Sequence, residues 1–174
     1  MQASSEADTR RVLQANFLFC DLSSEELSTL LEHIWLENIP AGSTIVHEGS
    51  EARELFLIIE GGVNVTKAPG QFLSYLGRNG FFGEMALFSE CATRTASCTA
   101  TSNTTCAVIR KHDLEAFCER EPRAGMKIYK AMVRALSQRL EATSADLATL
   151  MKAHIRSQSD ISSIVEKAKR KPVK

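Results

Sequence analysis

The stretch GFFGEMALFSECATRTASCTA, residues 80–100, places Glu84 and Arg94 among glycine, alanine, serine and threonine residues. The segment after Gly83 predicts one or two turns of helix, and the segment that contains Arg94 predicts a strand. Small residues let a backbone come close to a second molecule. The stretch therefore predicts a site, made by a short helix and a strand, where a second molecule comes close to the backbone.

The polar groups of this stretch predict a ligand that carries both a phosphate and a sugar hydroxyl. The first N–H groups of a helix after Gly83 have no intrahelical partner and favour an anion. Arg94 can hold a phosphate by two parallel hydrogen bonds, Thr95 adds a hydroxyl donor, and Ala96 leaves its backbone N–H accessible. Glu84 would repel a phosphate, so we expect it to accept a hydrogen bond from a ribose hydroxyl.

Residues 35–111 around the site predict an antiparallel β structure. Six short segments of strand character are separated by turn residues: TIVHEG (44–49), ELFLIIEG (54–61), GVNVTK (62–67), FLSYL (72–76), TASCTAT (95–101) and TTCAVIRK (104–111). Many short strands with glycine or proline between them are typical of a sandwich, roll or barrel.

Helices are predicted on both sides of the β region. A short helix is expected around residues 9–16, and a stronger one at 21–34, where Ser23 or Ser24 can act as the cap. In that helix the apolar residues share one face; they are Leu27, Leu30, Leu31 and Ile34. After the strands, HDLEAFCERE (112–121) predicts a short helix, Pro122 a break, and residues 123 to at least 156 one long helix.

The long helix carries a heptad seam. Its positions alternate in steps of three and four: Met126, Tyr129, Val133, Leu136, Leu140, Thr143, Leu147, Leu150, His154, Ser157, Ile161 and Ile164. A helix that packs on its own domain usually has a wider stripe, so this pattern favours a parallel coiled coil between two copies of the chain. The seam weakens at His154 and Ser157, and residues 157–174 are expected to form a separate basic tail.

The composition excludes several classes of protein. Lys plus Arg and Asp plus Glu both number 21, so no net charge attracts the chain to nucleic acid or anionic membranes. The five cysteines form no CxxC pair, which indicates reduced cytoplasmic thiols and no zinc or other metal. No segment is apolar enough to span a membrane. We find no HExxH, Walker or nucleophile-elbow motif, so no enzyme is predicted.

With these features, residues 80–100 resemble the phosphate-binding cassette of cyclic-nucleotide-binding domains. That family has FGE, an apolar pair, a short loop, and then Arg followed by Ser, Thr or Ala and by Ala. The flanking segments also match in order over roughly residues 17–150: PAGSTIVHEG (40–49), ELFLIIEGGVNV (54–65) and LSYLGRNGFFGE (73–84). The resemblance implies an α+β fold, a jelly-roll-like antiparallel β-roll with N-terminal helices and a long C-terminal helix.

The implied organisation has four parts: an N-terminal segment (1–16), the β-roll with flanking helices (17–122), a dimerisation helix (123–156) and the basic tail (157–174). Within the family, the chain most resembles the sensor domains of the bacterial catabolite-activator group, because QRLEATSADL (138–147) is similar to the part of their dimer helix that contacts adenine. That group continues into a helix-turn-helix domain. Only about 24 residues follow Leu150 here, so no DNA-binding domain is expected.

The resemblance implies cAMP as the ligand. Gly83 and Glu84 would take the ribose 2′-hydroxyl, the backbone N–H groups of Met85 and Ala86 would line the same pocket, and Arg94 with Thr95 would take the phosphate. Thr143 and the partner subunit's Ser144 would contact the base, Arg139 would steady Glu84, and an apolar wall would comprise Val65, Leu73 and Phe82.

Two points stay open in the sequence. An Arg-Thr-Ala cassette also occurs in cGMP-responsive members of the family, so Thr95 leaves cGMP as an alternative ligand, and Thr143 could instead set the coiled-coil register. The sequence thus predicts a stand-alone cytoplasmic cyclic-nucleotide sensor that signals through its long helix to an unidentified protein partner. The alternatives are a cGMP-selective sensor and a scaffold or dimerisation module with a vestigial site.

Overall fold

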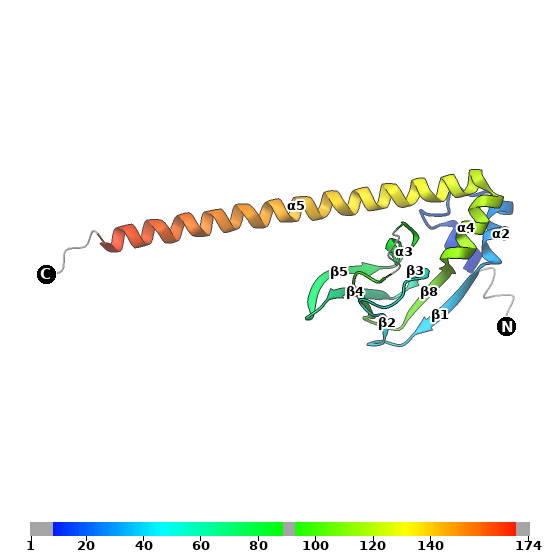
Figure 1. Ribbon diagram of the computed structural model, residues 1–174, viewed down its shortest axis with the longest axis horizontal. Coiled ribbons are helices and arrows are strands. Elements are labelled where there is room, and N and C mark those ends of the chain that lie inside the picture. The colour runs from blue at the N-terminus through cyan, green and yellow to red at the C-terminus, as the bar shows by residue number, and fades with distance from the viewer. Residues whose placement is uncertain (1–8, 89–92, 170–174) are drawn as a thin grey trace. The chain divides into compact units, whose positions relative to one another are not determined.

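The computed structural model describes residues 9–88 and 93–169 of the 174-residue chain (Figure 1). The chain divides into two compact units, Met1–Lys130 and Ala131–Lys174, which we describe one at a time. The first unit holds all the strands and the shorter helices, and the second holds most of the long C-terminal helix.

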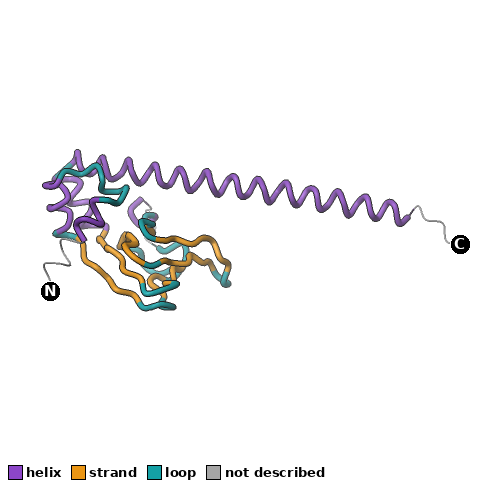
Figure 2. Tube along the Cα trace, turned by 180° about the vertical axis from the view of Figure 1, so that it is seen from behind, coloured by secondary structure: helices purple, strands orange, loops and turns teal. Residues whose placement is uncertain are grey.

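Two antiparallel four-stranded sheets form the β-roll of the first unit. The strands are β1 (Ile34–Ile39), β2 (Thr44–Val46), β3 (Glu54–Glu60), β4 (Gly62–Lys67), β5 (Gln71–Gly77), β6 (Phe81–Phe82), β7 (Ser97–Ala100) and β8 (Thr104–Arg110). One sheet has the order β1-β8-β3-β6 and the other β2-β7-β4-β5. Figure 2 shows the strands together, with the helical segments of residues 9–31 and 111–120 beside them.

Alternation along the strands divides the buried side chains between two faces of the first sheet. Phe56 and Ile58 of β3 join Val108 of β8 in the core of the roll, together with residues of the second sheet. Leu55 and Leu57 lie on the opposite face, where they line a small space with Phe19 and Ile34. One sheet therefore separates the core of the roll from the packing of the N-terminal helices.

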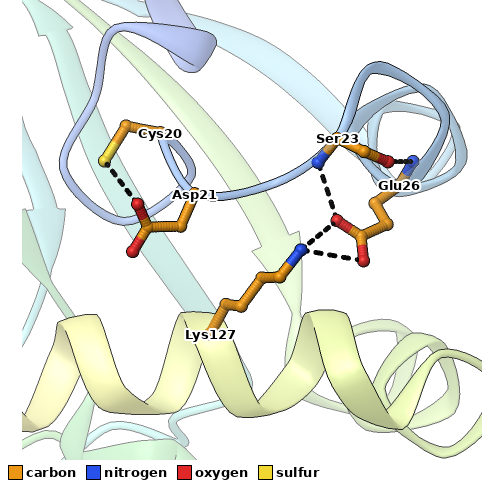
Figure 3. Close-up of polar contacts among 5 residues, drawn as sticks. All are labelled: Cys20, Asp21, Ser23, Glu26 and Lys127. Atoms are coloured by element: carbon orange, nitrogen blue, oxygen red, sulfur yellow. Dashed lines mark hydrogen bonds and ion pairs between the residues drawn. The ribbon is translucent and has the colours of Figure 1, made fainter.

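The helix α2 (Ser24–Leu31) begins with a complete capping box (Figure 3). The Ser23 hydroxyl accepts a hydrogen bond from the Glu26 backbone N–H at 3.1 Å, and the Glu26 carboxylate accepts one from the Ser23 N–H at 2.7 Å. Lys127, in the first turns of α5 (Pro122–Lys169), donates to both Glu26 oxygens at 2.7 and 3.1 Å. The carboxylate that caps α2 therefore also anchors the beginning of α5.

The prediction of a helix over residues 21–34 was wrong at its end. The helix ends at Leu31, and Ile34, expected on its apolar face, is the first residue of β1. The segment Ile34–Ile39 pairs along its whole length with β8, from Ile34 opposite Ile109 to Ile39 opposite Thr104. This pairing satisfies the backbone of an Ile- and Trp-containing segment that suits a strand, and tertiary context therefore overrides the local helical pattern.

The C-terminal helices follow the sequence pattern closely. α4 (Lys111–Arg120) ends before Pro122, which occupies the first position of α5, where a missing N–H costs nothing. α5 continues to Lys169, so residues 157–169, expected to be a separate tail, are helical. Among the described residues, none of the helices combines the length and the apolar character that crossing a bilayer requires.

Apolar side chains of the heptad seam are exposed along α5. Val133, Leu140, Leu147 and Leu150 have exposed fractions of 57–68%. Tyr129 differs, because its hydroxyl hydrogen-bonds with Cys118 of α4, and its burial raises its pKa to about 12. The side chains of Ser157, Ile161 and Ile164 lie outside the described residues.

We predict that Ser23→Ala will lower the free energy of unfolding by about 1 kcal/mol, because it removes the hydroxyl that caps α2. Chemical denaturation measures the change. Ser24→Ala is the matched control, since Ser24 is the next residue and the capping hydroxyl belongs to Ser23. Equal losses in the two variants would contradict the cap assignment.

The ion pair between Glu26 and Lys127 predicts a pH-dependent contribution to stability. Hydrogen bonds from Lys127, and then from the Ser23 N–H, hold the pKa of Glu26 below its ordinary value. A lowered pKa stabilises the fold above the unfolded-state pKa, and the contribution disappears as the pH falls through the folded-state pKa. Lys127→Met should therefore be less stable than the wild type at neutral pH, with the difference vanishing in acid. Lys130→Met is the control, and a pH-independent difference would contradict this prediction.

Candidate functional site

Gly83 and Glu84 connect β6 to the four-residue helix α3 (Met85–Phe88). The sequence predicts the short helix but not the two-residue strand before it. Gly83 has a φ of +85°, and a Cβ atom built there would lie 2.5 Å from the Glu54 carbonyl oxygen and 2.6 Å from Arg94 Nη1. Both the backbone conformation and the lack of space require glycine at this position. The Gly83 backbone therefore lies directly against the Arg94 guanidinium.

Arg94 is a buried cation with a defined set of partners. Its side chain is 5% exposed, and its Nη1 and Nη2 donate to the backbone carbonyl and the side-chain Oε2 of Glu54, both at 2.9 Å. The guanidinium carbon also lies 5.5 Å from the centre of the Phe56 ring, in a cation–π arrangement. Its Nε–H has no acceptor among the described residues. One hydrogen-bond donor of a buried cation is thus available to a ligand.

The negative charges around Arg94 and the burial of its side chain have opposite effects on its pKa. Burial lowers the pKa of Arg94 from its ordinary value, whereas the Glu54 carboxylate, and more weakly Glu84, act in the opposite direction. An arginine keeps its proton in this situation. Burial also raises the pKa of the Cys98 thiol to about 11, so Cys98 is neutral at physiological pH. Arg94, Glu54 and Glu84 are therefore the charged groups of the site.

Arg94 was predicted to lie on a strand, and this was wrong. β7 begins only at Ser97, and Arg94 lies three residues before it, where its backbone bonds to the turn at residues 49–50. The Arg94 N–H donates to the Ser50 carbonyl, and the Gly49 N–H donates to the Arg94 carbonyl, both at 2.8 Å. Pairing with a turn in place of a neighbouring strand fixes the backbone of Arg94 and directs its side chain into the roll.

The other cassette residues differ in their exposure. Glu84 is half-buried, and its carbonyl accepts a hydrogen bond from the Leu87 N–H at 3.0 Å, so it precedes α3 directly. Thr95 is exposed, and Ala96 is half-buried. Met85 is 49% exposed at the beginning of α3. The side chain of Ala86 lies outside the described residues, as do residues 89–92 of the predicted cassette loop.

The three residues of the predicted apolar wall have different environments. Phe82 is buried and stacks on Phe56 with ring centres 4.8 Å apart, and Val65 packs against the same core. Leu73 is 47% exposed on β5. Val65 pairs with Ser74 and Thr66 with Phe72, which leaves Leu73 as the additional residue of a β-bulge. Only Phe82 and Val65 therefore belong to the core beneath the cassette.

Arg139, Thr143 and Ser144 belong to α5 in the second unit. Thr143 and Ser144 are exposed, and the Thr143 hydroxyl donates to the Arg139 carbonyl at 2.9 Å, a bond within the helix. The expected contacts of these residues with the base and with Glu84 stay predictions.

Glu54 is the site residue that the sequence analysis missed. Its segment was correctly predicted as a strand, but nothing in ELFLIIEG distinguishes its first glutamate from a solvated strand terminus. The pairing with Arg94 joins positions 40 residues apart. The alternation of apolar residues could have placed Phe56 in the core, although not beneath a guanidinium.

Comparisons with known proteins relate the sequence of this region to a family. Residues 36–121 match the family model of the cyclic nucleotide-binding domain. The cAMP-activated global transcriptional regulator CRP of Haemophilus influenzae is 37% identical over 86 residues, which cover 47% of this chain and 38% of that protein. The CRP of Salmonella typhimurium is 30% identical over 128 residues, 71% of this chain and 59% of that protein. This chain therefore spans less than two thirds of the length of either relative.

A solved structure extends the likeness to the fold. The cyclic nucleotide-binding domain of Methylobacillus flagellatus superposes with a TM-score of 0.67 and 28% sequence identity, and the match covers 76% of each chain. The antiparallel sheets and flanking helices of the first unit are thus those of the predicted β-roll. Residues 36–121, which include Gly83, Glu84 and Arg94, are thus similar in sequence to the cyclic nucleotide-binding domain family.

Proposed function

We propose that this protein is a regulatory sensor that binds cAMP at the cassette around Arg94 and signals through α5 to a partner protein. The observation that carries this proposal is the buried Arg94 guanidinium, whose Nε–H has no acceptor among the described residues. A buried donor without a partner is costly, and a phosphate oxygen is a strong acceptor for a guanidinium. Gly83 supports the same reading, because its bare backbone leaves the guanidinium approachable.

The remaining cassette residues would complete the recognition of the nucleotide. Glu84 would accept a hydrogen bond from the ribose 2′-hydroxyl beside Gly83, and the N–H groups of Met85 and Ala86 would line the pocket. Thr95 would share the phosphate with Arg94. The name of the related CRP proteins, cAMP-activated regulators, supports cAMP as the nucleotide.

Signalling requires that the nucleotide prefers one arrangement of α5 over another, because only a difference in affinity can shift an equilibrium. Thr143 and the partner subunit's Ser144 would supply that difference by contacting the base, with Arg139 steadying Glu84. The exposed apolar seam of α5 supports a homodimer. We expect the protein to act in the cytoplasm as a binding protein and not as an enzyme.

Two observations favour other functions of the same site. Thr95 is exposed and could donate its hydroxyl to a guanine, which favours cGMP. Glu54 already occupies two nitrogens of Arg94, which favours a scaffold with a vestigial site. A titration of the protein with cAMP and with cGMP distinguishes these two alternatives from a cAMP sensor.

We predict that isothermal titration of the full chain will show binding of cAMP with a measurable stoichiometry per chain. Arg94→Ala should weaken binding roughly hundredfold or more, because it removes the only buried cation proposed to contact the phosphate. Arg53→Ala is the matched control, since Arg53 is an exposed arginine that pairs with Glu51. It should leave the affinity unchanged.

The outcomes separate the alternatives. A clear preference for cGMP over cAMP would replace cAMP as the ligand. No heat of binding, together with an unchanged melting temperature at millimolar concentrations of either nucleotide, would leave the scaffold as the better function.

We also predict that the α5 seam forms a homodimer. Replacing Leu140 and Leu147 by Lys should convert a dimer to a monomer at micromolar concentration, measured by sedimentation velocity, because charges in an apolar seam are unpaired. Met151→Lys is the control: Met151 is 58% exposed on the same helix but lies off the seam. The prediction of a homodimer through this seam would be wrong if the wild type were a monomer, or if Met151→Lys dissociated the dimer as much as the two leucine replacements.

A further inference from the structure

We propose that Glu54 lowers the affinity of the cassette for its anionic ligand, because its carboxylate holds the guanidinium that the ligand phosphate needs. This inference rests on the proposed function and deepens it by naming the residue that sets the affinity. Neither the cassette motif nor the family match identifies Glu54 as a residue of the site.

The geometry makes the carboxylate and a phosphate competitors. Both terminal nitrogens of Arg94 already donate to Glu54, one to its backbone carbonyl and one to its carboxylate. Phe56 covers one face of the guanidinium, and the Gly83 backbone approaches Nη1. A phosphate that accepts two parallel hydrogen bonds can take one from Nε–H, but the second must come from a terminal nitrogen that already donates to Glu54. Each terminal nitrogen carries a second N–H, so the phosphate can share that nitrogen only by lying close to the Glu54 oxygens.

The charges lead to the same conclusion. Arg94 contributes one positive charge, and Glu54 and Glu84 contribute one negative charge each, so the three groups sum to −1 before any ligand arrives. A cyclic phosphodiester adds another negative charge. Because like charges at short range repel strongly in a partly buried site, the Glu54 carboxylate opposes the ligand even where it does not compete for a nitrogen.

The Glu54 side chain is also positioned so that a ligand phosphate can displace its carboxylate from Arg94. It is the first residue of β3, and its side chain is 32% exposed, whereas the side chain of Arg94 is 5% exposed. The carboxylate can therefore turn to water while the cation stays. Binding becomes an exchange, in which a phosphate replaces the carboxylate and the carboxylate is hydrated. An uncharged nucleoside lacks the charge to drive this exchange.

Calorimetric titration of cAMP and cGMP into the wild-type full chain and two neutral variants tests the inference. Glu54→Gln keeps an oxygen acceptor and removes the charge, and Glu54→Thr removes the charge with a β-branched residue that suits a strand. We expect both variants to bind the nucleotide roughly tenfold more tightly than the wild type. Glu60→Gln, an exposed glutamate at the other end of β3, is the matched control and should change nothing.

The second measurement is thermal melting. Without nucleotide the neutral variants should melt at a lower temperature than the wild type, because Arg94 loses its counter-charge, and nucleotide should raise their melting temperature by more. Either variant alone is sufficient if the other does not fold.

Each outcome decides between the two proposals. If the wild type binds and the neutral variants bind equally or more weakly, Glu54 is not a competitor, although the sensor function stands. If only the neutral variants bind, Glu54 masks the site, and the proposed sensor function of the wild-type chain fails. If none of the proteins binds, both proposals fail.

Discussion

A guanidinium taken out of water needs a counter-charge, acceptors for its N–H groups and a flat surface to rest on. The roll supplies these to Arg94 from β3: Glu54 provides the carboxylate and a carbonyl, and Phe56 provides the ring. The connection between β6 and α3 can then approach the cation only where no side chain intervenes, which is at Gly83. The site is thus organised around the buried charge of Arg94, and Glu54, Phe56 and Gly83 all lie close to its guanidinium.

Both sheets contribute to the core beneath that arrangement. Phe56 stacks on Phe82 beneath the cation, and both belong to the core that the two sheets share. On the outer face of the same sheet, Leu55 and Leu57 lie against residues that precede and follow α2. A single strand, β3, therefore contributes to the core, to the packing of the helices and to the partners of Arg94, which connects the stability of the fold to the chemistry of the cassette.

The sequence predicts those parts of the molecule that depend on local patterns. The six named strands, the turn at Gly83, Pro122 as a boundary and the long helix follow from periodicity and from glycine and proline chemistry. β1 was missed because its pairing with β8 decides its conformation, and that contact joins residues about 70 positions apart. Glu54 was missed for the same reason: its role depends on a partner brought close by the closure of the roll. Local sequence patterns carry no information about which distant residues the fold brings together. The resemblance to a family identified only the residues of the cassette motif itself, and Glu54 lies outside that motif.

The helix α5 is continuous over 48 residues, so at about 1.5 Å per residue it is about 72 Å long. Its first turns are bound to the capping carboxylate of α2 through Lys127. Successive residues of an α-helix point about 100° apart, so the ion pair between Lys127 and Glu26 fixes the direction in which the side chains of the first turns of α5 point. The capping carboxylate of α2 therefore sets the azimuth of the helix at the point where it leaves the first unit.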